Sequence, residues 1–93
     1  MVELHDGLIY DTSKAKCIGN EENGESRSDF NFKEYSLYVT KNDRYFSVIE
    51  TRNAGGEDYE FEYFNEEQAM AWLENYNYID ELQKRFPGYL EDA

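Results

Sequence analysis

Three strand-like segments separated by short turns constrain the fold of this chain most. Residues 34–40 and 45–51 are rich in Tyr, Val, Ile and Thr, which are enriched in strands, and they flank the polar residues 41–44. A second turn at 53–56 leads to 58–63, where aromatic and acidic side chains alternate. The pattern predicts a β-hairpin extended by one more strand, with Tyr59, Phe61 and Tyr63 facing the core.

The N-terminal third predicts shorter strands. Residues 8–10 form a candidate first strand that ends at a turn made by the side-chain oxygens of residues 11–13, and residues 15–18 form a second strand. Residues 19–29 have the composition of a loop, in which Gly24 is available for a positive φ.

The C-terminal third predicts helix. Asn65 and Gln68 have the spacing of a capping box, and apolar residues follow at helical intervals: Ala69, Trp72, Leu73 and Tyr76, then, after a break at Asn77, Ile79, Leu82 and Phe86. Lys84 and Arg85 suit a last helical turn, and Pro87-Gly88 ends the helix.

Together these elements predict an α+β fold. We expect a single domain over residues 1–93, in which an antiparallel β-meander of four or five strands packs against a C-terminal helix or helices. The mean hydropathy of -0.93 and net charge of -12 are typical of disorder, but nine Tyr, six Phe and one Trp supply enough apolar area for a core.

The charge is strongly acidic and unevenly distributed. Residues 1–52 carry ten acids and seven bases, residues 53–93 carry eleven acids and two bases, and no base occurs between Asn53 and Gln83. Such a field repels nucleic acid and anionic membranes and attracts basic surfaces. We therefore expect a basic protein surface as the partner, with no direct contact to nucleic acid or membrane.

The cellular compartment is inferred from features that the sequence lacks. One Cys permits no internal disulfide, and neither a membrane-spanning apolar run nor a signal segment occurs. These features predict a cytoplasmic protein.

The candidate site is a group of carboxylates. In a strand, Asp58, Glu60 and Glu62 leave the same face at intervals of about 7 Å, which resembles the row of negative charges on a nucleic-acid strand. Such a row is also what keeps an exposed sheet soluble, so the charge by itself leaves both interpretations open. The predicted partner-binding residues are Glu57, Asp58, Glu60, Glu62, Glu66, Glu67, Glu74, Asp80 and Glu81.

Catalysis has little support in the sequence. His5 and Cys17 are the only residues of their types and lack a local nucleophile signature, and Cys17 is expected to be half-buried. The segment 20–24 lacks the ligand spacing of a calcium loop, and no phosphate loop or zinc pattern occurs. We expect no enzyme activity, metal or cofactor, although a carboxylate pair in a cleft stays possible at this stage.

The aromatic residues of the C-terminal half have two interpretations. Rings with a polar tip are common interface anchors, which is one possible role for Tyr63, Trp72, Tyr76, Tyr78 and Tyr89. Core packing is favoured for Trp72 and Tyr63.

A resemblance adds to this interpretation. Three segments resemble small proteins carried by phages, plasmids and integrative elements, namely Asp6-Gly7-Leu8-Ile9-Tyr10-Asp11-Thr12, Ser36-Leu37-Tyr38-Val39-Thr40-Lys41, and Glu66-Glu67-Gln68-Ala69 with Trp72-Leu73-Glu74. Because these motifs are turns and core positions, the resemblance implies a shared fold more strongly than a shared activity.

In size, charge and lack of catalytic residues the chain is also similar to anti-CRISPR proteins. That similarity implies a DNA mimic, a monomer or homodimer in the host bacterial cytoplasm, that inhibits a CRISPR effector (Cas9 or Cascade) by occupying its nucleic-acid-binding surface. The alternatives are an inhibitor of another DNA-binding enzyme, such as a restriction enzyme, and a small oligomerising structural protein of a mobile element.

Overall fold

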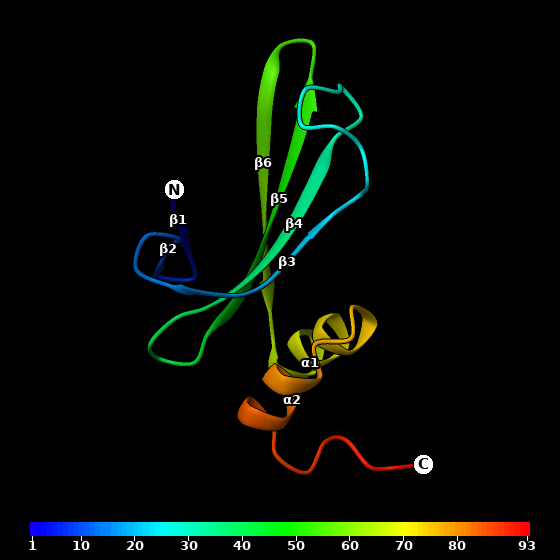
Figure 1. Ribbon diagram of the computed structural model, residues 1–93. Coiled ribbons are helices and arrows are strands. Elements are labelled where there is room, and N and C mark those ends of the chain that lie inside the picture. The colour runs from blue at the N-terminus through cyan, green and yellow to red at the C-terminus, as the bar shows by residue number, and fades with distance from the viewer.

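A four-stranded antiparallel sheet is the centre of the computed structural model, which describes residues 1–93 (Figure 1). Its strands follow chain order: β3 (Lys16–Glu22), β4 (Lys33–Val39), β5 (Tyr45–Asn53) and β6 (Gly56–Phe64). Two helices, α1 (Glu66–Asn75) and α2 (Ile79–Arg85), follow the sheet. The predicted α+β meander with C-terminal helices is thereby confirmed.

The first eleven residues form a separate two-stranded sheet. β1 (Val2–His5) pairs with β2 (Leu8–Asp11), and both turn residues have a positive φ, 50° at Asp6 and 75° at Gly7. An Asp-Gly pair with two positive φ values is typical of a tight hairpin turn whose twist matches its strands. The sequence prediction recognised the strand at 8–10 and missed its partner at 2–5.

Strand β3 is longer than expected. Residues 19–22 were predicted to begin a loop, yet they pair with β4, and the loop spans only residues 23–32. These residues form a strand despite their loop-like polar composition. The Asn20 side chain supports the pairing with β4 by donating to Ser36 Oγ at 2.9 Å. Gly24, with a φ of 89°, has the predicted left-handed conformation.

The helix boundaries agree with the sequence prediction. Gln68 N donates to Asn65 Oδ1 at 2.8 Å and Asn65 N donates to Gln68 Oε1 at 2.9 Å, so the capping box is present. The helical conformation is interrupted at Asn77, whose φ is 62°, before α2 begins.

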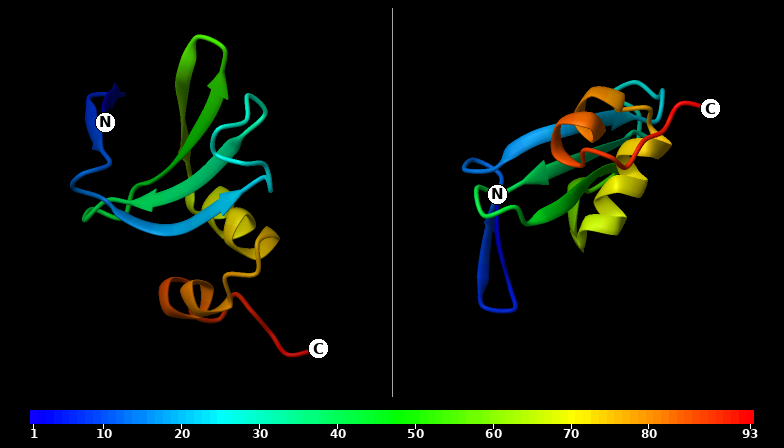
Figure 2. Two further views of the ribbon diagram at one scale, coloured as in Figure 1. Left: turned by 45° about the horizontal axis from the view of Figure 1, so that its top comes forward. Right: turned by 90° about the horizontal axis from the view of Figure 1, so that it is seen from below.

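Each face of the sheet carries its own apolar cluster. On one face, Leu37, Val39 and Tyr45 pack against Ala69 and Leu73 of α1 and Leu82 of α2. On the other, Tyr10 of β2 packs against Phe46 and Val48 of β5. Figure 2 shows the helices and the β1–β2 hairpin on different sides of the sheet.

This arrangement corrects the predicted orientation of β6. Phe61 and Tyr63 pack on the face that the β1–β2 hairpin covers, Phe64 packs on the helix face, and Tyr59 is 47% exposed rather than in the core. The aromatic pair Tyr63-Phe64 gives the end of β6 an apolar side chain on both faces. Asp58, Glu60 and Glu62 consequently lie on the helix side of the sheet.

The helices cover only one end of that face. In Figure 1 they lie below the sheet, whereas the turn between β5 and β6 projects from the opposite end, and the molecule measures 44 × 36 × 17 Å. No helix is long and apolar enough to cross a membrane.

Candidate protein-binding surface

The acidic row consists of Asp58, Glu60 and Glu62 on the helix side of β6. The strand register places them opposite Thr51, Ile49 and Ser47 of β5, in that order. All three are exposed, and none takes part in an ion pair. Asp58 accepts a hydrogen bond from the Asn53 side-chain amide, so the predicted alternation yields a row of carboxylates without a basic partner on an edge strand.

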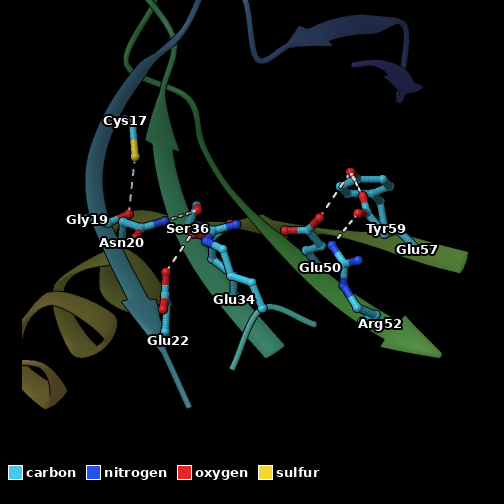
Figure 3. Close-up of polar contacts among 11 residues, drawn as sticks. Cys17, Gly19, Asn20, Glu22, Glu34, Ser36, Glu50, Arg52, Glu57 and Tyr59 are labelled. Carbon is cyan, nitrogen blue, oxygen red and sulfur yellow. Dashed lines mark hydrogen bonds and ion pairs between the residues drawn. The ribbon is translucent and has the colours of Figure 1, made fainter. Parts of the chain in front are cut away.

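Glu57 does not belong to the acidic row. It lies on the opposite face of β6, forms an ion pair with Arg52, and accepts a hydrogen bond from Tyr59 Oη at 2.7 Å (Figure 3). The bond from Tyr59 is the main reason that the pKa of Glu57 lies below its ordinary range, and the same bond raises the pKa of Tyr59 to about 12. Tyr59 thus remains a hydrogen-bond donor at neutral pH.

The acidic residues on the helices have different surroundings. Glu67 and Glu74 are exposed and lie outside the ion pairs, on the side of α1 away from Ala69 and Leu73. Glu66 lines a shallow hollow with Lys84 and Arg85. Glu81 pairs with Arg85, whose Nε lies 2.7 Å from Glu81 Oε2, and Asp80 is exposed. Of the nine predicted residues, only Glu57 and Glu81 are held by a base.

A second line of carboxylates crosses the sheet on the face that carries the β1–β2 hairpin. Glu22, Glu34 and Glu50 are cross-strand neighbours in β3, β4 and β5, and Arg27 reaches Glu22 at 3.1 Å and Glu34 at 3.0 Å. Burial is the main cause that raises the pKa of Glu50, and the neighbouring carboxyl groups of Glu57 and Glu34 raise it further. Positions so distant in the chain meet only through strand register, and no local pattern predicts them.

The two residues considered for catalysis are engaged separately. His5 stacks on Tyr63 with ring centroids 3.8 Å apart, and its Nε2 lies 3.3 Å from Asp6. Cys17 is exposed rather than half-buried, and its thiol donates to the Gly19 carbonyl at 3.3 Å. Cys17 is the second residue of the edge strand β3 and pairs with Tyr38 on the face opposite the helices.

One hollow, at the start of α2, is lined by two neighbouring carboxylates. Its volume is about 510 Å³, and Asp80 and Glu81 line it with Ile18 and Tyr78. Arg85 holds Glu81, so the hollow presents one free carboxylate rather than a pair.

Tyr63 and Trp72 pack as the sequence predicted. Trp72 lies over Gly19, and a Cβ at that glycine would come within 2.4 Å of the indole ring. Tyr78 Oη accepts from Asn20 N at 3.0 Å and so ties α2 to the edge strand β3. Tyr89, in contrast, is exposed.

Comparisons with protein-family models, with curated proteins and with solved structures find no match to this chain.

Proposed function

We propose that this chain is an inhibitor that binds the basic nucleic-acid-binding surface of a CRISPR effector, such as Cas9 or Cascade, through an acidic face that mimics DNA. The observation that carries the proposal is the acidic row, three exposed carboxylates on one side of β6 without a basic partner. The choice of a CRISPR effector comes from the similarity in size and charge to anti-CRISPR proteins.

The spacing of the row supports mimicry of a phosphate backbone. Alternate residues of a strand are about 7 Å apart, and proteins grip nucleic acid with rows of Lys and Arg that face regularly spaced charges. None of the three carboxylates takes part in an ion pair, so no base of this chain already neutralises them. A basic groove would pair them without first breaking an internal ion pair.

The shape of the molecule supports the same proposal. The β5–β6 hairpin projects beyond the helices (Figure 1), and the acidic row runs along β6 from Asp58 near the turn to Glu62 near the helices. Glu67 and Glu74 extend the negative surface onto α1. We expect the hairpin to enter the effector's DNA channel and exclude the target duplex sterically and electrostatically.

An electrophoretic mobility assay tests the proposal. Purified Cas9 or Cascade, loaded with guide, is mixed with the protein before labelled target DNA is added, and the retained DNA complex is measured. We expect loss of the DNA complex with the wild-type protein. The double variant Glu60→Lys/Glu62→Lys is expected to inhibit at least about tenfold more weakly, because each reversal replaces an attractive charge pair with a repulsive one.

The matched control is Glu25→Lys/Asp92→Lys, which changes net charge equally at two exposed positions outside the predicted face. Equal loss of inhibition in both double variants contradicts a site-specific role for the acidic row. Unimpaired DNA binding by each effector at saturating wild-type protein rejects CRISPR effectors as the target.

A restriction enzyme or another DNA-binding enzyme is the alternative target of the same acidic face. The physical argument is unchanged, since such enzymes also hold DNA with basic surfaces. Affinity capture from a lysate of a CRISPR-bearing host, followed by mass spectrometry, distinguishes these targets by the enzyme recovered.

Assembly with further copies is the alternative from a different class. Five of the nine large apolar residues that are exposed lie in the first nine positions, and on the β1–β2 hairpin Val2, Leu4 and Ile9 are 61%, 74% and 68% exposed. Apolar patches of this kind mark contact surfaces. Sedimentation at several protein concentrations checks this function, and a persistent monomer argues against it.

A further inference from the structure

The bases of this acidic protein gather at one end of the molecule. The turn between β2 and β3 contributes Lys14, β3 begins with Lys16, the turn between β4 and β5 contributes Lys41 and Arg44, and α2 ends with Lys84 and Arg85. The turn between β4 and β5 and the end of α2 both lie at the lower end in Figure 1, opposite the β5–β6 turn. Six of the nine bases therefore come from elements away from the acidic row.

A hollow at this end brings four of these bases together. Its volume is about 270 Å³, and Lys14, Lys16, Lys41 and Arg85 line it against a single carboxylate, Asp43. None of the three lysines takes part in an ion pair. With Glu81 counted as the partner of Arg85, four cations face two anions, which leaves a local charge of +2 within a chain whose net charge is -12.

Arg85 is oriented by its neighbours. Glu81 accepts from its Nε at 2.7 Å, and only 15% of the Arg85 side chain is exposed. The guanidinium carries five N–H donors, so one bond to Glu81 leaves others for a ligand. Two further acids lie close by: Glu66 lines the neighbouring hollow that Arg85 and Asp43 share, and Asp11 lines another with Lys14 and Lys41.

We propose that this hollow binds a phosphate group, carried either by a small molecule or by a nucleic-acid backbone. Three compact, rotatable ammonium groups from two segments, residues 14–16 and the β4–β5 turn, suit a tetrahedral dianion, whereas a planar carboxylate is matched best by a paired Arg fork. The volume of about 270 Å³ is enough for a phosphate group with part of its hydration.

The net negative charge does not prevent such binding. At physiological ionic strength the Debye length is about 8 Å, whereas the molecule is 44 Å long. Charges near the β5–β6 turn, such as Asp58, are therefore largely screened from an anion in the hollow. Glu62, opposite Ser47, lies nearer to the hollow, where the local cations outnumber it. The site is separate from the acidic row, so the two proposals are tested independently.

Nuclear magnetic resonance titration of the full chain tests the site. The probes are inorganic phosphate, pyrophosphate and a short single-stranded oligothymidylate, with an oligoglutamate peptide as the carboxylate comparison. We expect amide shifts centred on residues 14–16 and 41–43, and affinity that falls as salt is added. Lys41→Glu is expected to weaken binding at least about tenfold, the size of one lost charge-assisted bond.

Lys33→Glu is the matched control, because Lys33 is also exposed and lies at the other end of β4, outside the hollow. Binding of inorganic phosphate supports a small ligand, and binding of the oligonucleotide alone supports a backbone phosphate. The proposal is overturned if no phosphate probe shifts these residues, if oligoglutamate binds as tightly, or if Lys33→Glu weakens binding as much as Lys41→Glu.

Discussion

At the scale of single residues, contacts between distant segments decide what each side chain does. Gly19 is required because Trp72 lies over it, and Tyr59 is a hydrogen-bond donor because Glu57 and Glu50 lie beside it. Position in a local pattern did not reveal either role. The capping pair Asn65 and Gln68 is the opposite case, since its spacing alone predicted its bonds.

Replacement of Gly19 by Ala tests the contact with Trp72. The added Cβ would meet the indole ring at 2.4 Å, so the ring or the edge strand has to move, and we expect a loss of about 1–3 kcal/mol in the free energy of unfolding. Urea denaturation followed by far-ultraviolet circular dichroism measures this loss in either background, since Trp72 is the single tryptophan of the chain. In a Trp72→Phe background the same substitution is expected to cost less, and an equal cost in both backgrounds would show that the indole is not the cause.

Glu50→Gln tests the carboxylate line across the sheet. Burial and the neighbouring carboxylates raise the pKa of Glu50 above 4.5, so the folded state favours its protonated form. Its contribution to stability is therefore present below about pH 4.5 and is lost as pH rises through the raised pKa. We expect the variant to be more stable than wild type by roughly 0.5 kcal/mol near neutral pH, with the difference shrinking as the pH falls.

Urea denaturation at about pH 7 and about pH 5 measures the effect of Glu50→Gln. Glu25→Gln, on the exposed loop between β3 and β4, is the control and is expected to change stability little at either pH. A variant at position 50 that is less stable than wild type near neutral pH would contradict the predicted repulsion.

At the scale of elements, the strand and helix signals were clearest where local chemistry agreed with packing. The hairpin of β4 and β5, the two helices and the break at Asn77 follow from residue type and spacing. Strand β1 and the last part of β3 did not, because an edge position allows polar residues that the same pattern assigns to a loop. The Asp6-Gly7 turn was the available signal for β1.

The start of α1 offers a test at this scale. Asn65→Ala removes the side-chain acceptor of Gln68 N and is expected to lower the free energy of unfolding by about 1 kcal/mol. Asn75→Ala, at the exposed end of the same helix, is expected to be neutral or slightly stabilising, since Ala favours helix. Equal losses in chemical denaturation would indicate that the capping box contributes nothing specific.

At the scale of the whole molecule, charge separation matters more than net charge. The acidic row lies on the helix side of the projecting β5–β6 hairpin, and the basic hollow lies between the β2–β3 and β4–β5 turns and the end of α2. The net charge of -12 predicts a basic partner and argues against binding to nucleic acid. The basic hollow instead gives one end of the molecule a surface of the opposite sign.

By itself the sequence determined the α+β class, the β4–β5 hairpin, the helix starts and the spacing of Asp58, Glu60 and Glu62, because these depend on neighbours a few residues apart. Only the tertiary structure decided which face of the sheet the helices cover, and with it the face on which those carboxylates lie. It also brought Glu22, Glu34 and Glu50 into one line and four bases around one hollow. Those arrangements depend on strand register and on docking between segments far apart in the chain, and local periodicity does not reveal either.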